Sequence, residues 1–318
     1  MEKLRILLSI DAMDEDFSSL VCKLSNFADI NYTTSDDYSL KDYDILIAKK
    51  LKEEQLKEAN RLKVIFAYKT GVDDFPLLAL DKKNIRLYNS HANARIIAEY
   101  AFSLSVSLCI NINKLDYNLR RGIWYDEDIA YWQSIFSLRI GLLGFGQIGQ
   151  EIYKILKNNQ IETYTIDRNH DYDHNIHLVK NLDELIENTD LIIASLPKTL
   201  ETNHLFDEAR LKKMKNKYLV NVGRSNIFDQ KELYFALKNL DLKGAALDTW
   251  EKKPKDKNSL LAPSKYPINE LFNAILSPHN AMKVKDGHRK YVDEVTSQVI
   301  SYIDGGKLFN LVDLKKGY

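Results

Sequence analysis

Short apolar runs alternate along the chain with segments in which apolar residues recur at helical spacing. Phe17, Leu20, Val21 and Leu24 illustrate this spacing, and we expect the charged stretch Lys52–Leu62 to be helical too. The alternation predicts parallel sheets whose strands are joined by crossover helices. In the first part of the chain, the predicted strands are Leu4–Ile10, Tyr43–Ala48, Val64–Ala67 and Arg86–Asn89.

A second series of elements begins at Arg139. A strand, a glycine-rich turn and a helix open it, and further strands and helices follow. This order is that of a doubly wound nucleotide-binding domain. The predicted strands are Ile140–Leu143, Glu162–Ile166, Leu191–Ala194, Tyr218–Val222, Gly244–Leu247 and Ala274–Leu276, and the predicted helices are Ile148–Lys157, Leu182–Glu187, Glu208–Met214 and Lys231–Asn239.

Two further helical segments flank the second series. Ala94–Ile110 is apolar on nearly every face, as is expected of a helix packed on both sides, between two domains or two subunits. Val292, Val295 and Val299 mark an amphipathic terminal helix that Gly305 closes. Because this helix follows the second series, we expect it to cross back to the first domain.

The composition indicates which partners to expect. The 318 residues are enough for about two domains. The 45 Lys and Arg residues balance the 45 Asp and Glu residues, so no basic field indicates nucleic acid or an anionic membrane as a partner. A small-molecule ligand is therefore favoured.

Several features favour a cytoplasmic protein. Cys22 and Cys109 lie within apolar helical patterns, where we expect them to be buried hydrophobes in a reducing compartment. The N-terminal sequence carries acid as well as base and runs directly into a strand, unlike a signal peptide. The most apolar stretch, Ile96–Ile112, has 17 residues and contains Glu99, so we do not expect it to span a membrane.

A glycine fingerprint lies between the first strand and the first helix of the second series. Gly144 permits a tight turn, Gly146 lets the backbone approach a pyrophosphate, and Gly149 permits close packing of helix on strand. The backbone amides of Gln147 and Ile148 then face the phosphates at the positive end of the helix. The alternative is a glycine turn that packs a helix and binds no ligand.

An acidic residue strengthens the nucleotide interpretation. Asp167 follows Gly149 after 17 intervening residues and ends the next predicted strand, where a carboxylate can accept hydrogen bonds from the adenosine ribose. Because this carboxylate would repel a 2′-phosphate, we expect NAD rather than NADP, although Arg168 lies beside it.

Several motifs outside the glycine fingerprint resemble one family. The chain resembles the D-2-hydroxyacid dehydrogenases over roughly residues 64–300, with the motifs in the family's order and spacing. The motifs are Thr70-Gly71-Val72-Asp73, Ile97-Ala98-Glu99, Leu219-Val220-Asn221-Val222-Gly223-Arg224-Ser225, Ala246-Leu247-Asp248-Thr249-Trp250 and Leu276-Ser277-Pro278-His279.

The resemblance implies NAD-linked interconversion of a 2-oxo acid and a D-2-hydroxy acid. The Arg224 guanidinium would bind the substrate carboxylate and polarise its carbonyl oxygen, as a planar bidentate donor can. His279 would act as the general acid and base, because an imidazole titrates near the working pH. The alternatives are that Arg224 is a surface arginine after a strand and that His279 is a loop histidine without a chemical role.

The resemblance also implies a binding role for other residues. The backbone around Gly71 and Val72 would hold the substrate carboxylate, and Lys69 would either reach an anionic substrate or be solvated. Asp248 would hold the nicotinamide amide. The cofactor would also contact Leu196, Pro197, Val222 and Gly223.

The expected fold class is α/β with two doubly wound parallel-sheet domains. A Rossmann NAD-binding domain (residues 93–282) would be inserted into a flavodoxin-like substrate domain (residues 1–92 and 283–318). The resemblance and the apolar helix Ala94–Ile110 together favour a homodimer.

One position departs from the family pattern. The glutamate that normally orients the catalytic histidine and raises its pKa is Lys253 here, just before Pro254. Another acid, Glu251 or Glu270, would replace it, or Lys253 would point outward and the site would work without a carboxylate. Alternatively, the chain is a non-catalytic NAD-binding regulator. A dehydrogenase of another anion, such as phosphite, is a further hypothesis.

One histidine-rich stretch resembles a metal site. Residues 169–177 contain three histidines and two aspartates. Because this stretch directly follows Asp167, we interpret it as a solvated loop near the adenosine and expect no metal.

Overall fold

The computed structural model describes residues 3–126, 131–168, 171–254, 256 and 258–318. Its internal contacts divide the chain into two units. Unit 1 combines Met1–Asn93 with Val284–Tyr318, and unit 2 is the uninterrupted stretch Ala94–Lys283. The chain therefore passes between the units twice, after Asn93 and after Lys283.

Unit 1 is built on a five-stranded parallel sheet with strand order β2-β1-β3-β4-β5. This is the flavodoxin-like order, in which the chain reverses direction between β1 and β3. Every residue of β3 and β4 is buried, because helices cover both faces of a doubly wound sheet. The strands are β1 (Leu4–Ser9), β2 (Ala28–Thr33), β3 (Ile45–Ala48), β4 (Val64–Ala67) and β5 (Arg86–Tyr88), and the helices are α1 (Glu15–Leu24), α2 (Leu77–Lys82) and α9 (Gly287–Ile303).

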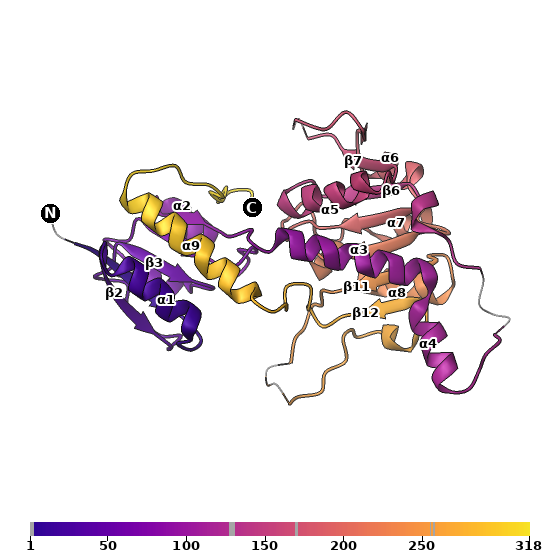
Figure 1. Ribbon diagram of the computed structural model, residues 1–318, viewed down its shortest axis with the longest axis horizontal. Helices are drawn as coiled ribbons and strands as arrows, with labels where there is room; N and C mark the ends of the chain where they lie inside the picture. The colour runs from indigo at the N-terminus through magenta and orange to yellow at the C-terminus, as the bar shows by residue number, and fades with distance from the viewer. Residues whose placement is uncertain (1–2, 127–130, 169–170, 255, 257) are drawn as a thin grey trace. The chain divides into compact units, whose positions relative to one another are not determined.

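The first and last helices of unit 1 lie side by side (Figure 1). Asp14 caps α1 by accepting a hydrogen bond from the Phe17 N–H at 2.9 Å. His288 at the start of α9 lies 3.1 Å from the Asp16 carboxylate and 3.5 Å from that of Asp14. These contacts join the two ends of the chain in one unit.

Unit 2 is built on a seven-stranded parallel sheet with strand order β12-β11-β10-β9-β6-β7-β8. This order is that of a Rossmann fold, and the reversal lies between β6 and β9. The strands are β6 (Ile140–Leu143), β7 (Thr163–Ile166), β8 (Ile176–Val179), β9 (Leu191–Ala194), β10 (Tyr218–Asn221), β11 (Gly244–Leu247) and β12 (Ala274–Leu276), and the helices are α3 (Ala94–Ile110), α4 (Ile112–Arg120), α5 (Gln147–Asn158), α6 (Leu182–Asn188), α7 (Glu208–Lys213) and α8 (Gln230–Lys238). The predicted fold class is thus confirmed.

Helix α3 packs on one side within its own unit. Its buried face packs on α5 and on strands β10 and β11 of its own unit, whereas Glu99 and Ser103 are exposed. Asn111 adopts a left-handed conformation and separates α3 from α4. No single helix within the described residues is long and apolar enough to cross a membrane, although α3 and α4, bent by 61°, pass that test as a pair.

Two sequence predictions were wrong, and two strands were missed. Strands β2 and β8 were not predicted, and the predicted helix Lys52–Leu62 is only a 3₁₀ turn, Glu53–Leu56. Cys22 is exposed rather than buried, because α1 buries Phe17, Leu20 and Leu24 on its other face. Cys109 is buried as expected.

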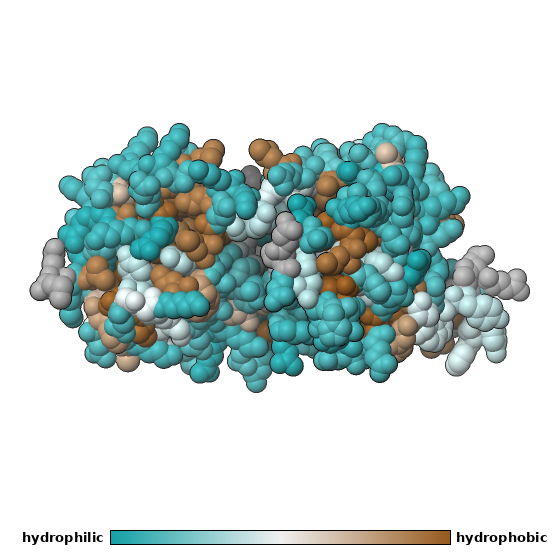
Figure 2. All heavy atoms as spheres, turned by 90° about the horizontal axis from the view of Figure 1, so that it is seen from above, coloured by the Kyte–Doolittle hydropathy of each residue, from teal (hydrophilic) through white to brown (hydrophobic). Residues whose placement is uncertain are grey.

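The face of the molecule drawn in Figure 2 is largely hydrophilic, with smaller hydrophobic areas between.

Candidate active site

The glycine turn after β6 has the geometry that its sequence predicts. Gly144 has a φ of +106°, a conformation that other residues rarely adopt. A Cβ on Gly149 would lie 2.1 Å from the Gly144 carbonyl oxygen, so no larger residue fits there without moving the backbone. The Ser195 hydroxyl donates to the same carbonyl oxygen at 3.3 Å. The turn is therefore fixed by close backbone packing.

The space in front of α5 is open. Gly146 precedes the first residue of α5, and a Cβ built on it would meet nothing within 4 Å. The N–H groups of the first turn, including those of Gln147 and Ile148, have no acceptor within the helix. An open position before a helix N-terminus accepts a phosphate. These residues therefore fit the pyrophosphate of a dinucleotide.

Asp167 lies at the same edge of the sheet as the glycine turn. It follows β7, which pairs directly with β6, and its N–H donates to the Val179 carbonyl at 2.9 Å. Its side chain is exposed, as is that of Arg168. The Arg168 N–H donates to the Tyr172 hydroxyl at 2.9 Å. A carboxylate on this strand end fits the adenosine ribose that a dinucleotide would place there.

The ends of β9 and β10 come into close contact at this edge. A Cβ on Gly223 would lie 2.6 Å from the Leu196 carbonyl oxygen, so the two segments touch through their backbones. Val222 is buried, whereas Leu196 and Pro197 are half-buried. These predicted cofactor contacts thus share one edge of the sheet with the glycine turn.

Arg224 follows directly and begins the 3₁₀ turn Ser225–Ile227. The Asn221 amide donates to the Arg224 carbonyl at 2.9 Å, which fixes the backbone. The guanidinium is half-buried and donates to the Gly223 carbonyl at 3.0 Å. The candidate substrate-binding cation therefore lies at the carboxyl end of β10.

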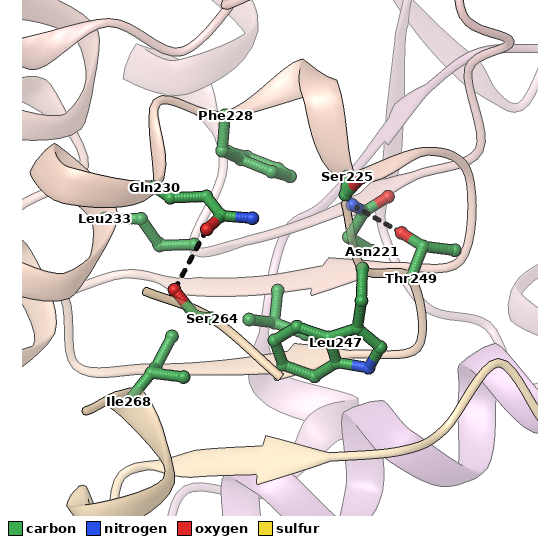
Figure 3. A pocket seen from close by; sticks show the side chains of 10 residues that line it. Asn221, Ser225, Phe228, Gln230, Leu233, Leu247, Thr249, Ser264 and Ile268 are labelled. Carbon is green, nitrogen blue, oxygen red and sulfur yellow. Dashed lines mark hydrogen bonds between the residues drawn. The ribbon is translucent and has the colours of Figure 1, made fainter. Parts of the chain in front are cut away.

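A small pocket lies under this turn (Figure 3). Within it the Asn221 amide donates to the Thr249 hydroxyl at 3.2 Å, and the Ser264 hydroxyl donates to Gln230 at 2.9 Å. Its volume of about 20 Å³ suits a single water molecule. The residues that line this pocket pack against the turn, and the pocket itself is too small to hold a substrate.

Asp248 holds the loop that carries His279. Its carboxylate is fully buried and accepts hydrogen bonds from the Ser277 hydroxyl at 2.5 Å, the Asn280 N–H at 2.7 Å and the Ala281 N–H at 3.1 Å. The motif identified Asp248 but gave no sign of these bonds. Its expected contact with the nicotinamide amide stays a prediction.

Two aromatic residues support the same loop. The Tyr100 and Ser277 hydroxyls lie 2.6 Å apart, and the Trp250 indole N–H donates to the Ser277 carbonyl at 2.7 Å. Sequence reasoning missed Tyr100 as a member of the site, because its place in an apolar helix gives no sign of a polar contact. Trp250 has a structural role here.

His279 is half-buried and adopts a φ of +57°. Burial lowers its pKa to about 4, and the charges of Lys253, Arg224 and Lys283 add to the effect while that of Asp248 opposes it. At neutral pH the imidazole is therefore uncharged.

Lys253 contacts His279 directly. Its Nζ lies 2.6 Å from the histidine Nδ1. The hypothesis that Lys253 points outward is therefore wrong. Among the described residues, neither Glu251 nor Glu270 contacts His279, so neither takes the place of the missing glutamate.

The remaining candidate residues belong to unit 1. Lys69 forms an ion pair with Asp74, and Val72 is buried. The loop is fixed through Thr70, whose hydroxyl donates to the Ser90 carbonyl at 2.9 Å and whose own carbonyl accepts from the Asn89 amide at 2.6 Å. Gly71 lies between these anchored positions.

A pocket of about 230 Å³ also lies in unit 1. It is lined at the carboxyl ends of β1 and β3 by Ser9, Lys50 and Leu51. Ligands of open α/β sheets bind at such a reversal of strand order.

The histidine-rich stretch lies partly outside the described residues, which omit 169 and 170. In its described part, Asp173 pairs with Lys157, and Ile176–Val179 form the edge strand β8. The loop interpretation is thus confirmed for residues 171–175 and wrong for Ile176 and His177, which belong to β8. Within the described residues, the side chains that are close enough together to hold a metal ion are those of Asp14, Asp16 and His288.

Comparison with known proteins identifies the family. The family model described as D-isomer specific 2-hydroxyacid dehydrogenase, NAD binding domain, matches residues 102–281. A glyoxylate reductase from Thermofilum pendens is 30% identical over 271 residues, which cover 82% of this chain and 77% of that protein. The structure of PH0520 from Pyrococcus horikoshii is 26% identical, with a TM-score of 0.84, and the match covers 98% of this chain and 95% of that one.

A D-lactate dehydrogenase from Aquifex aeolicus, solved with NAD and lactic acid, shares the fold. It is 21% identical with a TM-score of 0.79, and the match covers 94% of this chain and 96% of that one. The matched NAD-binding domain contains the glycine turn, Arg224 and His279, and the open space before α5 fits its dinucleotide. The chain belongs to the D-isomer-specific 2-hydroxyacid dehydrogenase family and takes a nicotinamide dinucleotide as its cofactor.

Proposed function

We propose that this chain reduces a small 2-oxo acid to a D-2-hydroxy acid and catalyses the reverse oxidation, with NAD as the cofactor. The observation that carries the proposal is that unit 2 places Arg224 after β10 and His279 after β12, at the carboxyl edge of one parallel sheet. Burial lowers the pKa of the imidazole most, and the charges of Lys253 and Arg224 add to the effect. A fixed cation beside a proton-transferring group is what a carbonyl reduction needs.

The two side chains have separate roles. Arg224 forks onto the substrate carboxylate and carbonyl oxygen, which orients the substrate and draws charge onto that oxygen. His279 gives the oxygen its proton in reduction and removes it in oxidation. The nicotinamide, when bound, supplies or accepts the hydride.

The cofactor is held by backbone and side chain together. The amides of Gln147 and Ile148 bind the pyrophosphate that Gly146 leaves room for, and Asp167 accepts hydrogen bonds from the adenosine ribose. Because a carboxylate repels a 2′-phosphate, NAD is preferred to NADP. The further contacts proposed are Gly144, Gly149, Leu196, Pro197, Val222, Gly223 and Asp248.

Three residues of unit 1 are further proposed substrate contacts. The backbone at Gly71 and Val72 holds the substrate carboxylate, and Lys69, now paired with Asp74, adds positive charge. Relatives named glyoxylate reductase and D-lactate dehydrogenase point to substrates with small side chains.

The test is consumption of NADH with a panel of small, branched, aromatic and dicarboxylic 2-oxo acids. We expect at least one acid to be reduced. His279→Asn, which tolerates a positive φ, lowers kcat by about 100-fold or more and leaves NADH binding unchanged. His204→Asn is the matched control, since His204 also has a positive φ, of 49°.

The alternative function is that of an NAD-binding regulator without catalysis, which the replacement of the family glutamate by Lys253 suggested. It requires that the protein binds NADH tightly but does not oxidise it with any 2-oxo acid in the panel. Such a result contradicts the proposed dehydrogenase activity.

We propose further that the protein is a cytoplasmic homodimer. Exposed aromatic side chains on α4 and in the described residues that follow it in the sequence support the dimer. We call this set the aromatic surface: Tyr117, Trp124, Tyr125, Tyr131 and Trp132. Aromatic groups of this kind are enriched at the centres of protein interfaces.

A further inference from the structure

The contact between Lys253 and His279 fixes the imidazole tautomer. A lysine ammonium donates hydrogen bonds and cannot accept them. At 2.6 Å from Nζ, the histidine Nδ1 must therefore be the acceptor. The ring is then neutral, with its proton on Nε2, and the lowered pKa of His279 agrees with this state.

This tautomer limits what His279 can do alone. Loss of the Nε2 proton from a neutral imidazole would leave an imidazolate anion, which is a poor product near neutral pH. The ring can give up that proton only if Nδ1 gains another at the same time. The group in contact with Nδ1 is the ammonium of Lys253, which carries three protons.

We propose that Lys253 is the proton source for reduction and that His279 relays its proton to the substrate. This inference rests on the proposed function. As the carbonyl carbon gains a hydride, the carbonyl oxygen takes the Nε2 proton, and Nδ1 takes a proton from Nζ. His279 ends neutral with its tautomer reversed, and Lys253 ends as a neutral amine.

The surroundings of the pair support this assignment. The charged groups that act on His279 are Lys253, Asp248, Arg224 and Lys283. Both oxygens of Asp248 are bonded to the loop, and Arg224 does not lose its proton in proteins. After product leaves, a proton from water on Nε2 sends the Nδ1 proton back to the exposed Lys253, which restores the ammonium and the starting tautomer.

The relay favours one direction of the reaction. The lysine side chain carries its protons as an ammonium, which is the form that gives a proton in reduction. Oxidation needs the neutral amine instead. We therefore expect the protein to work at neutral pH as a 2-oxo acid reductase.

The decisive variant is Lys253→Arg. Arginine keeps the positive charge and a hydrogen bond to Nδ1, but it does not release a proton. We expect this variant to reduce the 2-oxo acid at pH 8 at least 100-fold more slowly than the wild type, as general-acid loss typically does. NADH affinity should change less than twofold. Lys252→Arg, on the neighbouring exposed lysine, is the control.

The pH profile of Lys253→Met provides a second readout. Without the lysine, His279 must itself carry the transferred proton, so the residual rate should rise as the pH falls. Lys253→Glu restores the family pair and raises the pKa of His279, so its reduction should decline through neutral pH while the wild type stays active. A wild-type profile that declines through neutral pH contradicts the relay.

The tautomer can be tested without turnover. Nitrogen-15 NMR of histidine-labelled protein without cofactor should show His279 neutral, with its proton on Nε2, at pH 7. An imidazolium or a proton on Nδ1 would overturn the inference. If Lys253→Arg keeps its turnover, only the relay is overturned. If none of the 2-oxo acids in the panel allows the wild type to oxidise NADH, the proposed function itself is overturned.

Discussion

Gly146 differs from Gly144 and Gly149 in what a methyl group would meet. Its Cβ would enter open space, whereas a Cβ on Gly149 would lie 2.1 Å from a backbone oxygen. Gly146, just before α5, therefore has no packing reason to be glycine. Its reason is the approach of a phosphate.

Gly146→Ala should separate binding from folding. We expect the thermal unfolding midpoint to stay within about 2 °C while the Kd for NADH, followed by fluorescence, rises by about tenfold. Gly149→Ala should instead destabilise the fold by about 1–3 kcal/mol, as overpacking does. Unchanged NADH affinity in Gly146→Ala would contradict the proposed role of this position.

At this scale, sequence motifs predicted single residues but not their partners. Arg224 and His279 stand in motifs of fixed spacing, so their positions could be predicted from the sequence. Lys253 lies in an irregular loop, where apolar residues follow no helical or strand repeat, so its contact with His279 could not be predicted from the sequence. The bonds of Asp248 depend on how that loop folds back on β11.

The loop after β12 is the element on which the chemistry depends. A single buried carboxylate, that of Asp248, accepts three hydrogen bonds from it. His279 lies between two of the residues that make these bonds. The conformation of the loop, and with it the place of the imidazole, is thus set from the neighbouring strand β11.

Asp248→Asn should loosen this loop, because the amide NH₂ faces a donor and leaves it unpaired. We expect the free energy of unfolding to fall by about 1–3 kcal/mol in urea titrations, and kcat to fall with it. Asp304→Asn, on an exposed aspartate of unit 1, is the control. Full activity and stability in Asp248→Asn would show that other contacts hold the loop.

Strands in the middle of each sheet could be predicted closely from the sequence, as could the edge strands β5 and β12, whereas the edge strands β2 and β8 could not. Strands β6, β9 and β11 are buried throughout, so each appears as an unbroken apolar run. Strands β2 and β8 lie at the edges and expose half or more of their residues. A strand with exposed residues carries polar side chains among its apolar ones, so its sequence lacks the unbroken apolar run that predicts a buried strand.

At the scale of the whole molecule, we expect the aromatic surface to contact a second copy of the chain. We expect light scattering after gel filtration to give a mass near twice 36.8 kDa. The double variant Tyr131→Ser, Trp132→Ser should shift the protein to a monomer, because both side chains are exposed by 60% or more. Leu78→Ser replaces an exposed leucine on α2 of unit 1, and this variant should remain dimeric.

A monomeric wild type would contradict the dimer, and a dimeric double variant would place the interface elsewhere. The sequence suggested α3 as the contact, because its apolar residues surround the helix. Packing on α5, β10 and β11 accounts for much of that pattern instead. Burial inside a unit and burial between subunits leave the same pattern in a sequence.

The division of unit 1 between the two ends of the chain has a consequence for synthesis on the ribosome. Residues 1–93 are made before unit 2, but α9, which packs on α1 and β4, is made after it. Unit 2 is one continuous stretch and can fold as soon as it is made. The nascent chain thus carries an incomplete unit 1, with part of its core uncovered, until unit 2 and then α9 have been synthesised.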